Sequence, residues 1–385
     1  MALSGVVLGV DRFLSEGLYR SFREFKVAML SNQSAITSRI TYSIDELRGK
    51  GLDIKFVLVP EHGYWGVGDP GEVFGDAYDD ILNMLTRSIY GREEGFKALS
   101  EVDAVIIDIQ DVGVRFYTYV TAVLQTLEHS SRYGVSRVIV LDRPNPLGGS
   151  VAEGPILRSN CRSYVGYFEL PVRYGLTLGE LSLYYNDERG LGLDISVVSM
   201  SGYSRLLDAV DLGITWVPPS PAIPEKETVF TYPSIALLEG TNVSEGRGTY
   251  TPFRVFGAPF VNPRRLSEEL NSLGIPGVLF RPTYFKPKTS KYSGTTCGGV
   301  FVHVTHRKVL RVFKLGLSIL RTLYELYPEH LVFTKAGNGL YLDLLLGTTD
   351  WRDAVIHGRL SEFVAASEEE AERFKESVKP YILYS

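Results

Sequence analysis

The chain has 385 residues, of which 44% are hydrophobic and 22% charged, with 40 Lys plus Arg against 45 Asp plus Glu. This composition is typical of a globular protein with room for two domains, and it excludes disordered and fibrous chains. The net charge of −5 provides no overall field that would attract nucleic acid or anionic lipid, so we expect neither as a partner.

The cysteine count excludes a disulfide framework and a cysteine-rich zinc site, because the chain holds only Cys161 and Cys297. We expect both to be buried free thiols; a single disulfide bond between the two halves of the chain is the alternative.

The N-terminal segment MALSGVVLGVDRF has a short apolar run that no basic residue precedes and that Asp11 ends. This pattern is not typical of a signal peptide, and no stretch approaches the roughly 18 apolar residues of a membrane span. The sequence therefore predicts a cytoplasmic protein. The run from Gly5 to Val10 predicts a first strand, buried on both faces.

The first 150 residues alternate strand and helix signals. Continuous apolar runs predict strands, and 3.6-residue periodicity and a Ser43/Glu46 capping-box spacing predict helices. The predicted strands are 26–30, 53–59, 103–109 and 136–141, and the predicted helices begin at 43 and span 114–132. Strands separated by helices of this length indicate a Rossmann-like, doubly wound parallel sheet in an α/β domain.

The alternation of strand and helix signals continues to a proline-rich loop, after which the pattern changes. A capping box at Thr177 and Glu180 opens a helix to about residue 187, a strand spans 193–200, and residues 216–224 (WVPPSPAIP) predict a rigid loop. We place the domain boundary near residue 230, which divides the chain into 1–230, Rossmann-like and catalytic, and 231–385, a smaller α+β domain that completes a cleft. The second domain is predicted to hold helices at 263–273, 307–327 and 351–379 and strands at 278–284 and 298–304.

Polar residues follow three of the predicted strands. The segments 60–66, 110–117 and 142–149 are rich in charged, amide and glycine residues, whereas the strands before them are apolar. Because ligands bind outside the carboxyl ends of such strands, these segments predict the site.

Two sequence patterns that resemble binding motifs do not indicate a dinucleotide site or a metal site. Residues 66–71 match GxGxxG, but Pro70 and the residues after it do not open a helix, so the anion-binding helix N-terminus of a dinucleotide site is missing. His303 and His306 lie three apart in a predicted strand and face opposite sides, which favours packing or surface positions over metal binding.

The carboxylates carry more information. Cleavage of a glycosidic bond typically needs a carboxylic acid and a second carboxylate. Glu61 follows a strand beside His62 and two aromatic residues, which makes it the candidate acid. Asp111 is preferred to Asp108 as its partner, because Asp108 still lies within the apolar run; a helix cap or an ion pair with Arg115 or Arg143 is the alternative for either. Glu239 and Glu245 are the next candidates.

Basic and amide residues could bind the ligand. Arg115 and Arg247 suit a carboxylate or phosphate through paired hydrogen bonds, unless they form internal ion pairs. Asn145 and Asn242 suit sugar hydroxyls or an acetamido group, unless they only stabilise their own turns.

These residues belong to long motifs in a characteristic order: PEHG (60–63), IQDVGVRFYTY (109–119), LDRPNPLGG (141–149), AEGP (152–155), VRYGLTLGEL (172–181), WVPPSPAIP (216–224) and LLEGTNVSEGRGTYTPFRVFGAP (237–259). The series resembles the exo-β-N-acetylmuramidase family of the NamZ type, formerly a domain of unknown function, over essentially the whole chain.

The resemblance implies a Rossmann-like domain, a smaller C-terminal domain and a cleft at their junction. It implies an exo-acting glycoside hydrolase that releases N-acetylmuramic acid from the non-reducing end of peptidoglycan fragments, without metal or cofactor. The family's glutamate falls on Glu61, and the lactyl carboxylate of muramic acid would give Arg115 or Arg247 a purpose.

The predicted site is the following set: catalytic Glu61, Asp111 and His62, and substrate-binding Arg115, Tyr117, Arg143, Asn145, Glu239, Asn242, Glu245 and Arg247.

Other readings stay open on the sequence. Many relatives are exported and carry a signal peptide, whereas this N-terminus does not predict one. The expected substrate is therefore either an imported wall fragment or another acidic or N-acetylated sugar. A non-catalytic glycan- or metabolite-binding protein on the same scaffold is the alternative to an enzyme, although binding alone does not need an acid and a carboxylate together. The sequence assigns no oligomeric state.

Overall fold

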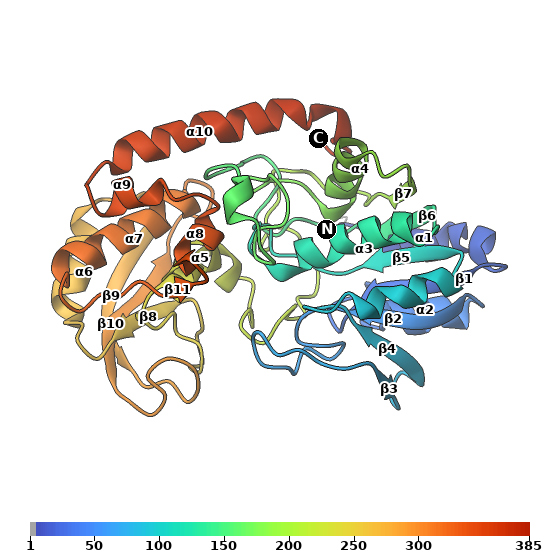
Figure 1. Cartoon of the computed structure of the whole chain (residues 1–385), viewed down its shortest axis with the longest axis horizontal. Coiled ribbons are helices and arrows are strands. Elements are labelled where there is room, and N and C mark those ends of the chain that lie inside the picture. The colour runs from blue at the N-terminus through green and yellow to red at the C-terminus, as the bar shows by residue number, and fades with distance from the viewer. Residues whose placement is uncertain (1–4) are drawn as a thin grey trace.

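A computed structural model describes residues 5–385 of the chain. Over these residues the largest sheet has seven strands in the order β3-β4-β2-β1-β5-β6-β7 (Figure 1). Its strands are β1 (Lys26–Ser31), β2 (Asp53–Val59), β3 (Ala77–Asp79), β4 (Met84–Ser88), β5 (Ala104–Asp108), β6 (Arg137–Leu141) and β7 (Asp194–Val198). All neighbours pair in parallel except β3 and β4, which are antiparallel.

The six parallel strands β4-β2-β1-β5-β6-β7 follow the strand order of the Rossmann fold. The order reverses between β1 and β5, where Val27 pairs with Ala104 and Ser31 with Asp108. Every residue of β5 is buried, as a strand covered on both faces requires.

Helices cover both faces of this sheet. On one face, α1 (Gly9–Ser15) and α2 (Ser43–Gly49) share a core with Val27 and Met29 of β1. On the other face, α3 (Thr118–Arg132), α4 (Leu178–Arg189) and the 3-10 helix η2 (Glu94–Glu101) share a core with Ala28 and Leu30. Side chains of one strand thus alternate between the two faces, and the predicted doubly wound α/β sheet is confirmed.

The N-terminal strand prediction is wrong. Within Gly5 to Val10 only Val7 makes an isolated bridge, to Ser201, and helix α1 begins at Gly9. A Cβ on Gly9 would lie 2.4 Å from the backbone of Asp142 and of Val198, so the helix start packs directly against the sheet edge. A short apolar run does not distinguish a buried strand from a buried helix end.

The helix starts agree with expectation in part. The capping box at Thr177 and Glu180 forms, with both hydrogen bonds present. Helix α2 begins at Ser43 as predicted, but its N-cap is Tyr42 and it has no side-chain capping bond. Helix α3 begins at Thr118 rather than at 114, because the preceding residues make a turn with Gly113 at φ 84°.

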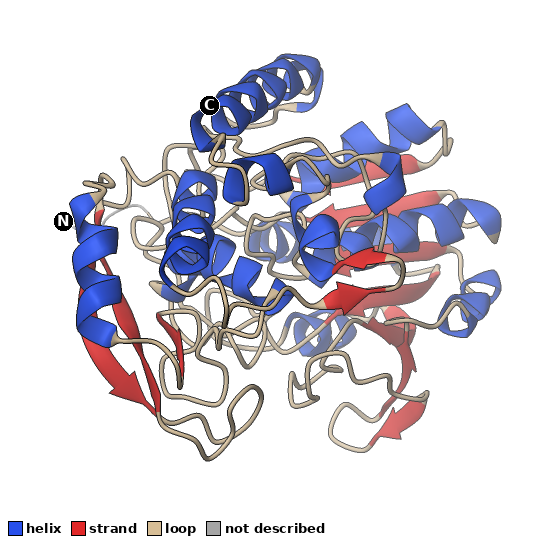
Figure 2. Ribbon diagram, turned by 60° about the vertical axis from the view of Figure 1, so that its left-hand side comes forward, coloured by secondary structure: helices blue, strands red, loops and turns tan. Residues whose placement is uncertain are grey.

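The second part of the chain is α+β. Strands β8 (Val255–Ala258), β9 (Val278–Phe285) and β10 (Cys297–Val304) form an antiparallel sheet in the order β8-β10-β9. The remaining elements are α5 (Thr228–Ile235), α6 (Pro263–Ser272), α7 (Val312–Leu326), α8 (Tyr341–Leu346), α9 (Trp351–Val355), α10 (Leu360–Ser377), β11 (Lys335–Ala336) and β12 (Gly339–Leu340), with short 3-10 helices η1 (Leu18–Phe22), η3 (Ser159–Cys161), η4 (Ala236–Gly240) and η5 (Lys379–Tyr381). Figure 2 shows the two larger sheets at opposite sides of the molecule with helices between them.

The chain returns to the first sheet at its end. Helix α10 crosses from the second part toward α4 (Figure 1), and Glu370 accepts a hydrogen bond from the backbone of Ile156 at 2.9 Å. The hydroxyl of Tyr384 donates to Asp142 at 2.5 Å. The boundary predicted near residue 230 falls inside α5, and the two parts share one continuous apolar core.

Cys161 and Cys297 are buried free thiols, as predicted. Among residues 5–385, no helix combines the length and the apolar character needed to cross a bilayer.

Candidate functional site

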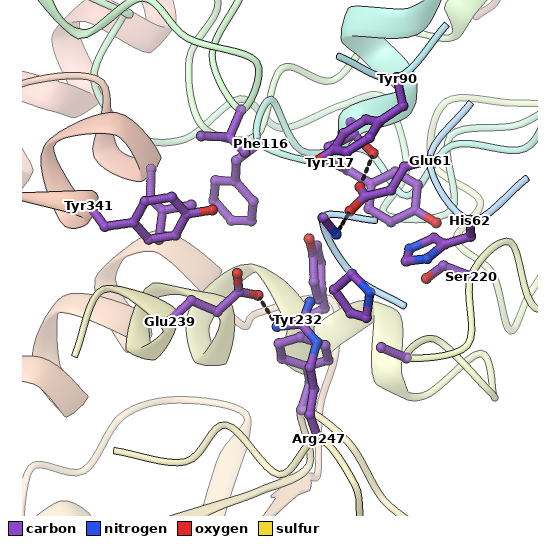
Figure 3. Close-up of a pocket in the computed structure, with 17 residues that line it drawn as sticks. Glu61, His62, Tyr90, Phe116, Tyr117, Ser220, Tyr232, Glu239, Arg247 and Tyr341 are labelled. Atoms are coloured by element: carbon purple, nitrogen blue, oxygen red, sulfur yellow. Dashed lines mark hydrogen bonds and ion pairs between the residues drawn. The ribbon is translucent and has the colours of Figure 1, made fainter. Parts of the chain in front are cut away.

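A cavity of about 220 Å³ lies where the carboxyl edge of the large sheet meets the second part of the chain. Its walls include Glu61, His62 and Tyr90 from the loops after β2 and β4, and Glu239 and Arg247 from the polar glycine-rich segment. Figure 3 shows Glu61 and His62 on one side of this pocket and Glu239 and Tyr341 on another. The pocket therefore combines residues from both predicted domains.

The carboxyl group of Glu61 is held in one orientation. Two residues after the end of β2, Glu61 is only 9% exposed. Its Oε1 accepts a hydrogen bond from the backbone N–H of Gly71 at 2.8 Å, and its Oε2 accepts one from the hydroxyl of Thr118 at 2.7 Å. One donor lies in the loop after β2 and the other is the first residue of α3, so the carboxyl group cannot turn without losing both hydrogen bonds.

The segment with the GxGxxG spacing, residues 66–71, supplies a backbone hydrogen bond to Glu61. No helix occurs within residues 60–76, so this segment lacks the helix N-terminus that a dinucleotide phosphate needs. Its chain turns back through His62 (φ 72°) and Gly71 (φ 78°), which presents the Gly71 amide to Glu61. A Cβ on Gly68 would lie 2.2 Å from the ring of Phe74, so a larger residue there would displace that ring.

His62 lies in the pocket wall beside Glu61. Its Nδ1 is 2.8 Å from the carbonyl oxygen of Gly68. A carbonyl oxygen only accepts, so Nδ1 carries the proton of this hydrogen bond.

An ion pair forms a further wall. Arg247 Nη1 lies 2.8 Å from Glu239 Oε1 and 3.5 Å from Glu245 Oε1, and the guanidinium group stacks over the ring of Phe253 at 4.8 Å. Desolvation raises the pKa of Glu239, and the charge of Arg247 opposes this rise. Desolvation lowers the pKa of Arg247, but the two carboxylates outweigh it and the net shift is upward.

Glu245 lies beneath this pair and does not line the pocket. It is 1% exposed, and its Oε2 accepts a hydrogen bond from Lys291 at 3.1 Å. Two cations and two carboxylates therefore balance one another in this wall.

Tyrosines supply much of the remaining surface. Burial raises the pKa of Tyr90 to about 12 and also raises the pKa of Tyr117, Tyr232 and Tyr341. All four phenols stay neutral near pH 7, where each offers a hydroxyl and an apolar ring face. This combination suits a polar ligand with apolar faces, such as a sugar.

Asp111, predicted as the partner of Glu61, does not line this pocket. Its Oδ2 accepts hydrogen bonds from the N–H of Gly113 at 2.6 Å and from the hydroxyl of Tyr174. Its Oδ1 has no hydrogen-bond partner among residues 5–385. Burial raises the pKa of Asp111 to about 6. The loop after β5 turns back on itself, so Asp111 stabilises its own turn and stays in the interior.

Two of the arginines predicted to bind the ligand also lie in the interior. Arg115 is 1% exposed and donates to the carbonyl oxygens of Pro155, Leu170 and Leu345, and desolvation lowers its pKa to about 9. Arg143 binds both carboxylate oxygens of Asp108 in a buried ion pair, the alternative considered for that aspartate. Neither arginine lines the pocket that holds Glu61.

The two asparagines bond to backbone, as their turn positions allowed. Asn145 donates to the carbonyl oxygen of Leu176 and accepts from the N–H of Leu147. Asn242 donates to His330 and accepts from Val332. Neither lines the pocket.

The pocket is also lined by residues outside the predicted set, namely Gly71, Tyr90, Thr118, Tyr232 and Tyr341. Thr118 touches Glu61 across 57 positions of the chain, and no local pattern marks such a contact. In the described residues 5–385, no group of three or more His, Cys, Asp or Glu side chains is arranged to hold a metal ion.

Comparisons with known proteins place this pocket in a family. The family model described as exo-beta-N-acetylmuramidase NamZ, N-terminal, matches residues 27–227, and the corresponding C-terminal model matches residues 230–384. The chain is 37% identical, over 98% of its length and 91% of the relative's, to a protein of Bacillus subtilis (strain 168) named peptidoglycan beta-N-acetylmuramidase NamZ.

Two solved structures of DUF1343 family proteins from Bacteroides fragilis NCTC 9343 share the fold. One superposes with a TM-score of 0.86 at 29% identity and the other with a TM-score of 0.76 at 28% identity, and each comparison covers 99% of both chains. The matches span both parts of the chain and therefore the whole pocket between them. This chain belongs to the exo-beta-N-acetylmuramidase NamZ family.

Proposed function

We propose that this protein is an exo-acting glycoside hydrolase that removes N-acetylmuramic acid from the non-reducing end of peptidoglycan fragments. The observation that carries the proposal is Glu61, a buried carboxyl group fixed in a pocket between two parts of a NamZ-family chain. The name of the relative from Bacillus subtilis, a peptidoglycan beta-N-acetylmuramidase, supports the substrate class.

Glu61 is the general acid of this proposal. In its acid form it gives its proton to the glycosidic oxygen while the bond from that oxygen to the anomeric carbon breaks, and the bonding electrons stay on the oxygen. Proton donation of this kind typically contributes about 10² to 10⁴ in rate. Its fixed orientation serves the reaction, because a general acid must lie within hydrogen-bond reach of the leaving oxygen.

Glu239 is the second carboxylate. It replaces Asp111 in this role because it lines the same pocket as Glu61 and comes from a different wall. Its pairing with Arg247 favours the charged form that a base or a nucleophile needs, against the desolvation that raises the pKa of Glu239. Whether it activates water or attacks the anomeric carbon decides if the anomeric configuration is inverted or retained.

Arg247 is the residue that selects muramic acid. Muramic acid differs from glucosamine by a lactyl ether that ends in a carboxylate. Arg247 is the one arginine of the predicted set that lines the pocket, whereas Arg115 and Arg143 are engaged in the interior. Arginine binds carboxylates through two parallel hydrogen bonds, which makes it suited to this group.

The pocket size favours release of single sugars. A cavity of about 220 Å³ is smaller than the roughly 300–1,000 Å³ of sites for drug-sized ligands, so it accommodates one terminal sugar better than a chain segment.

The test is product release from a defined substrate. The disaccharide of N-acetylmuramic acid β-linked to N-acetylglucosamine is incubated with the enzyme, and products are separated by liquid chromatography with mass detection. We expect equal amounts of the two monosaccharides, and NMR of fresh product reports its anomeric form. Absence of cleavage, with a saturable affinity for the same disaccharide, would identify a glycan-binding protein instead.

A further inference from the structure

The hydroxyl of Thr118 makes an unusual contact for the first residue of a helix. Thr118 opens α3, is 8% exposed, and its Oγ1 donates to Glu61 Oε2 at 2.7 Å. It makes no bond to the backbone of its own helix. In contrast, Thr126 and Ser130 of the same helix donate to the carbonyl oxygens four residues before them, both at 2.7 Å.

The Gly71 N–H and the Thr118 hydroxyl, which both donate to the Glu61 carboxyl group, differ in chemistry; the phenol of Tyr90 also faces this group. The Gly71 N–H can only donate, so Oε1 must stay an acceptor while this bond is kept. The Thr118 hydroxyl can donate and accept. A proton arriving at Oε2 therefore meets a partner that can turn and remain bonded, whereas a proton on Oε1 would break the bond to Gly71.

The surroundings of Thr118 keep this hydroxyl in place. Tyr117, directly before it, lines the same pocket and packs edge-on against Tyr119 and Tyr232, with ring centroids 4.7 and 5.9 Å away. The hydroxyl of Tyr119 donates to the carbonyl oxygen of Pro219 at 2.5 Å and accepts a hydrogen bond from the side-chain amide of Asn32 at 2.8 Å. The start of α3 is thus packed on both sides of Thr118.

We propose that Thr118 is a positioning residue for Glu61: its hydroxyl holds Oε2, the oxygen that gains and loses the catalytic proton, in both protonation states. This inference rests on the function proposed above. With Glu61 ionised, the hydroxyl donates to Oε2. With Glu61 protonated and no sugar bound, the hydroxyl turns to accept from Oε2. When the glycosidic oxygen takes that proton, the hydroxyl donates again to the carboxylate that forms, and Gly71 keeps Oε1 in place.

The experiment compares Thr118→Val, which keeps the shape and loses the hydroxyl, with Thr118→Ser, which keeps the hydroxyl. Thr126→Val is the matched control, because Thr126 lies on the same helix, is fully buried, and donates to the carbonyl of Ala122 in its own helix. The kcat and kcat/KM of each protein are measured against pH on the disaccharide, and circular dichroism checks the fold.

We expect Thr118→Val to lower kcat about tenfold, the cost of one hydrogen bond to a charged group. The alkaline limb of its kcat/KM profile moves up by about half to one pH unit, because the charged form of Glu61 loses a donor. Thr118→Ser restores both values to near those of the unaltered protein. Thr126→Val lowers the melting temperature and does not shift the alkaline limb of the kcat/KM profile.

A second measurement does not depend on turnover. With ¹³C-labelled glutamate, the side-chain signal of Glu61 is assigned by its loss in Glu61→Gln, and its titration is followed in the unaltered protein and in Thr118→Val. A midpoint that is the same in both proteins, or a Thr118→Ser variant as impaired as Thr118→Val, would overturn the role of Thr118. If the unaltered protein cleaves no disaccharide, the proposed function itself fails, and the role of Thr118 fails with it.

Discussion

Glu239 and Arg247 form an ion pair in the wall of the pocket that also holds Glu61, with Arg247 Nη1 2.8 Å from Glu239 Oε1. In the proposed mechanism the pair links recognition of the lactyl carboxylate to the second carboxylate, because one guanidinium group would contact both. A ligand carboxylate that binds Arg247 competes with Glu239 for the same donors. Substitutions in the pair therefore separate binding from catalysis only when kcat and KM are measured for more than one sugar.

Glu61→Gln is expected to lower kcat about 10² to 10⁴-fold, because the amide keeps the size of the side chain and cannot donate a catalytic proton. The melting temperature should change little, since the amide oxygen can still accept from Gly71. The measurement uses the natural disaccharide, because an activated nitrophenyl leaving group needs little protonation. Near-normal turnover of the disaccharide by this variant would refute the role of Glu61.

Arg247→Ala is expected to raise KM for muramic substrates by roughly ten- to a hundredfold, the loss of a charge-assisted bond of about 1.5 to 3 kcal/mol. The corresponding glucosamine substrate should be affected less, because it has no carboxylate. Arg254→Ala is the matched control: Arg254 pairs with Glu225 and stacks on Phe301 at 5.1 Å outside this pocket. An equal rise of KM on both sugars would show that Arg247 only supports the wall.

Glu239→Gln and Asp111→Asn distinguish the two candidates for the second carboxylate. Glu239→Gln is expected to lower kcat by about 10² or more, since an amide is neither a base nor a nucleophile at neutral pH. Asp111→Asn should retain kcat within a few-fold, because Asp111 lies in the interior and bonds to Tyr174 and Gly113. The opposite ranking of the two variants would return the catalytic role to Asp111.

The stability of the fold is expected to depend on pH through Asp111. Burial raises its pKa to about 6 from an ordinary value of 3.8, so the folded chain binds this proton more tightly than the unfolded chain does. Its contribution to the free energy of unfolding is therefore present below about pH 4 and is lost as the pH rises through about 6.

Urea unfolding between pH 4 and 7 measures this contribution. Relative to Asp111→Asn, the free energy of unfolding of the unaltered protein should fall by on the order of 2 kcal/mol between the acid and the neutral end of this pH range. The difference is the informative quantity, because Asp142, whose pKa burial also raises to about 6, titrates in both proteins. A difference that does not vary with pH would show that Asp111 titrates alike in both states.

Much of the fold was predictable from local pattern. The strands at 26–30, 53–59, 103–109 and 136–141 are found within one or two residues of their expected ends. Continuous apolar runs are a strong signal there, because these strands are buried on both faces. The strand predicted at 5–10 is wrong, because the buried start of a helix that packs against the sheet has the same apolar composition as a buried strand.

The sequence by itself determined the α/β class, the sheet edge that carries the polar loops, and the positions of Glu61, His62, Tyr117, Glu239 and Arg247 in the pocket. It could do so because the carboxyl ends of parallel strands meet at one edge, and because long motifs mark the family. Only the tertiary structure decided which charged groups face the pocket and which face one another. Arg143 meets Asp108 across 35 positions, and Thr118 meets Glu61 across 57. Burial makes an unpaired charge costly, so each charged side chain in the interior takes the partner that packing brings to it, and that partner is set by the whole fold rather than by neighbouring residues.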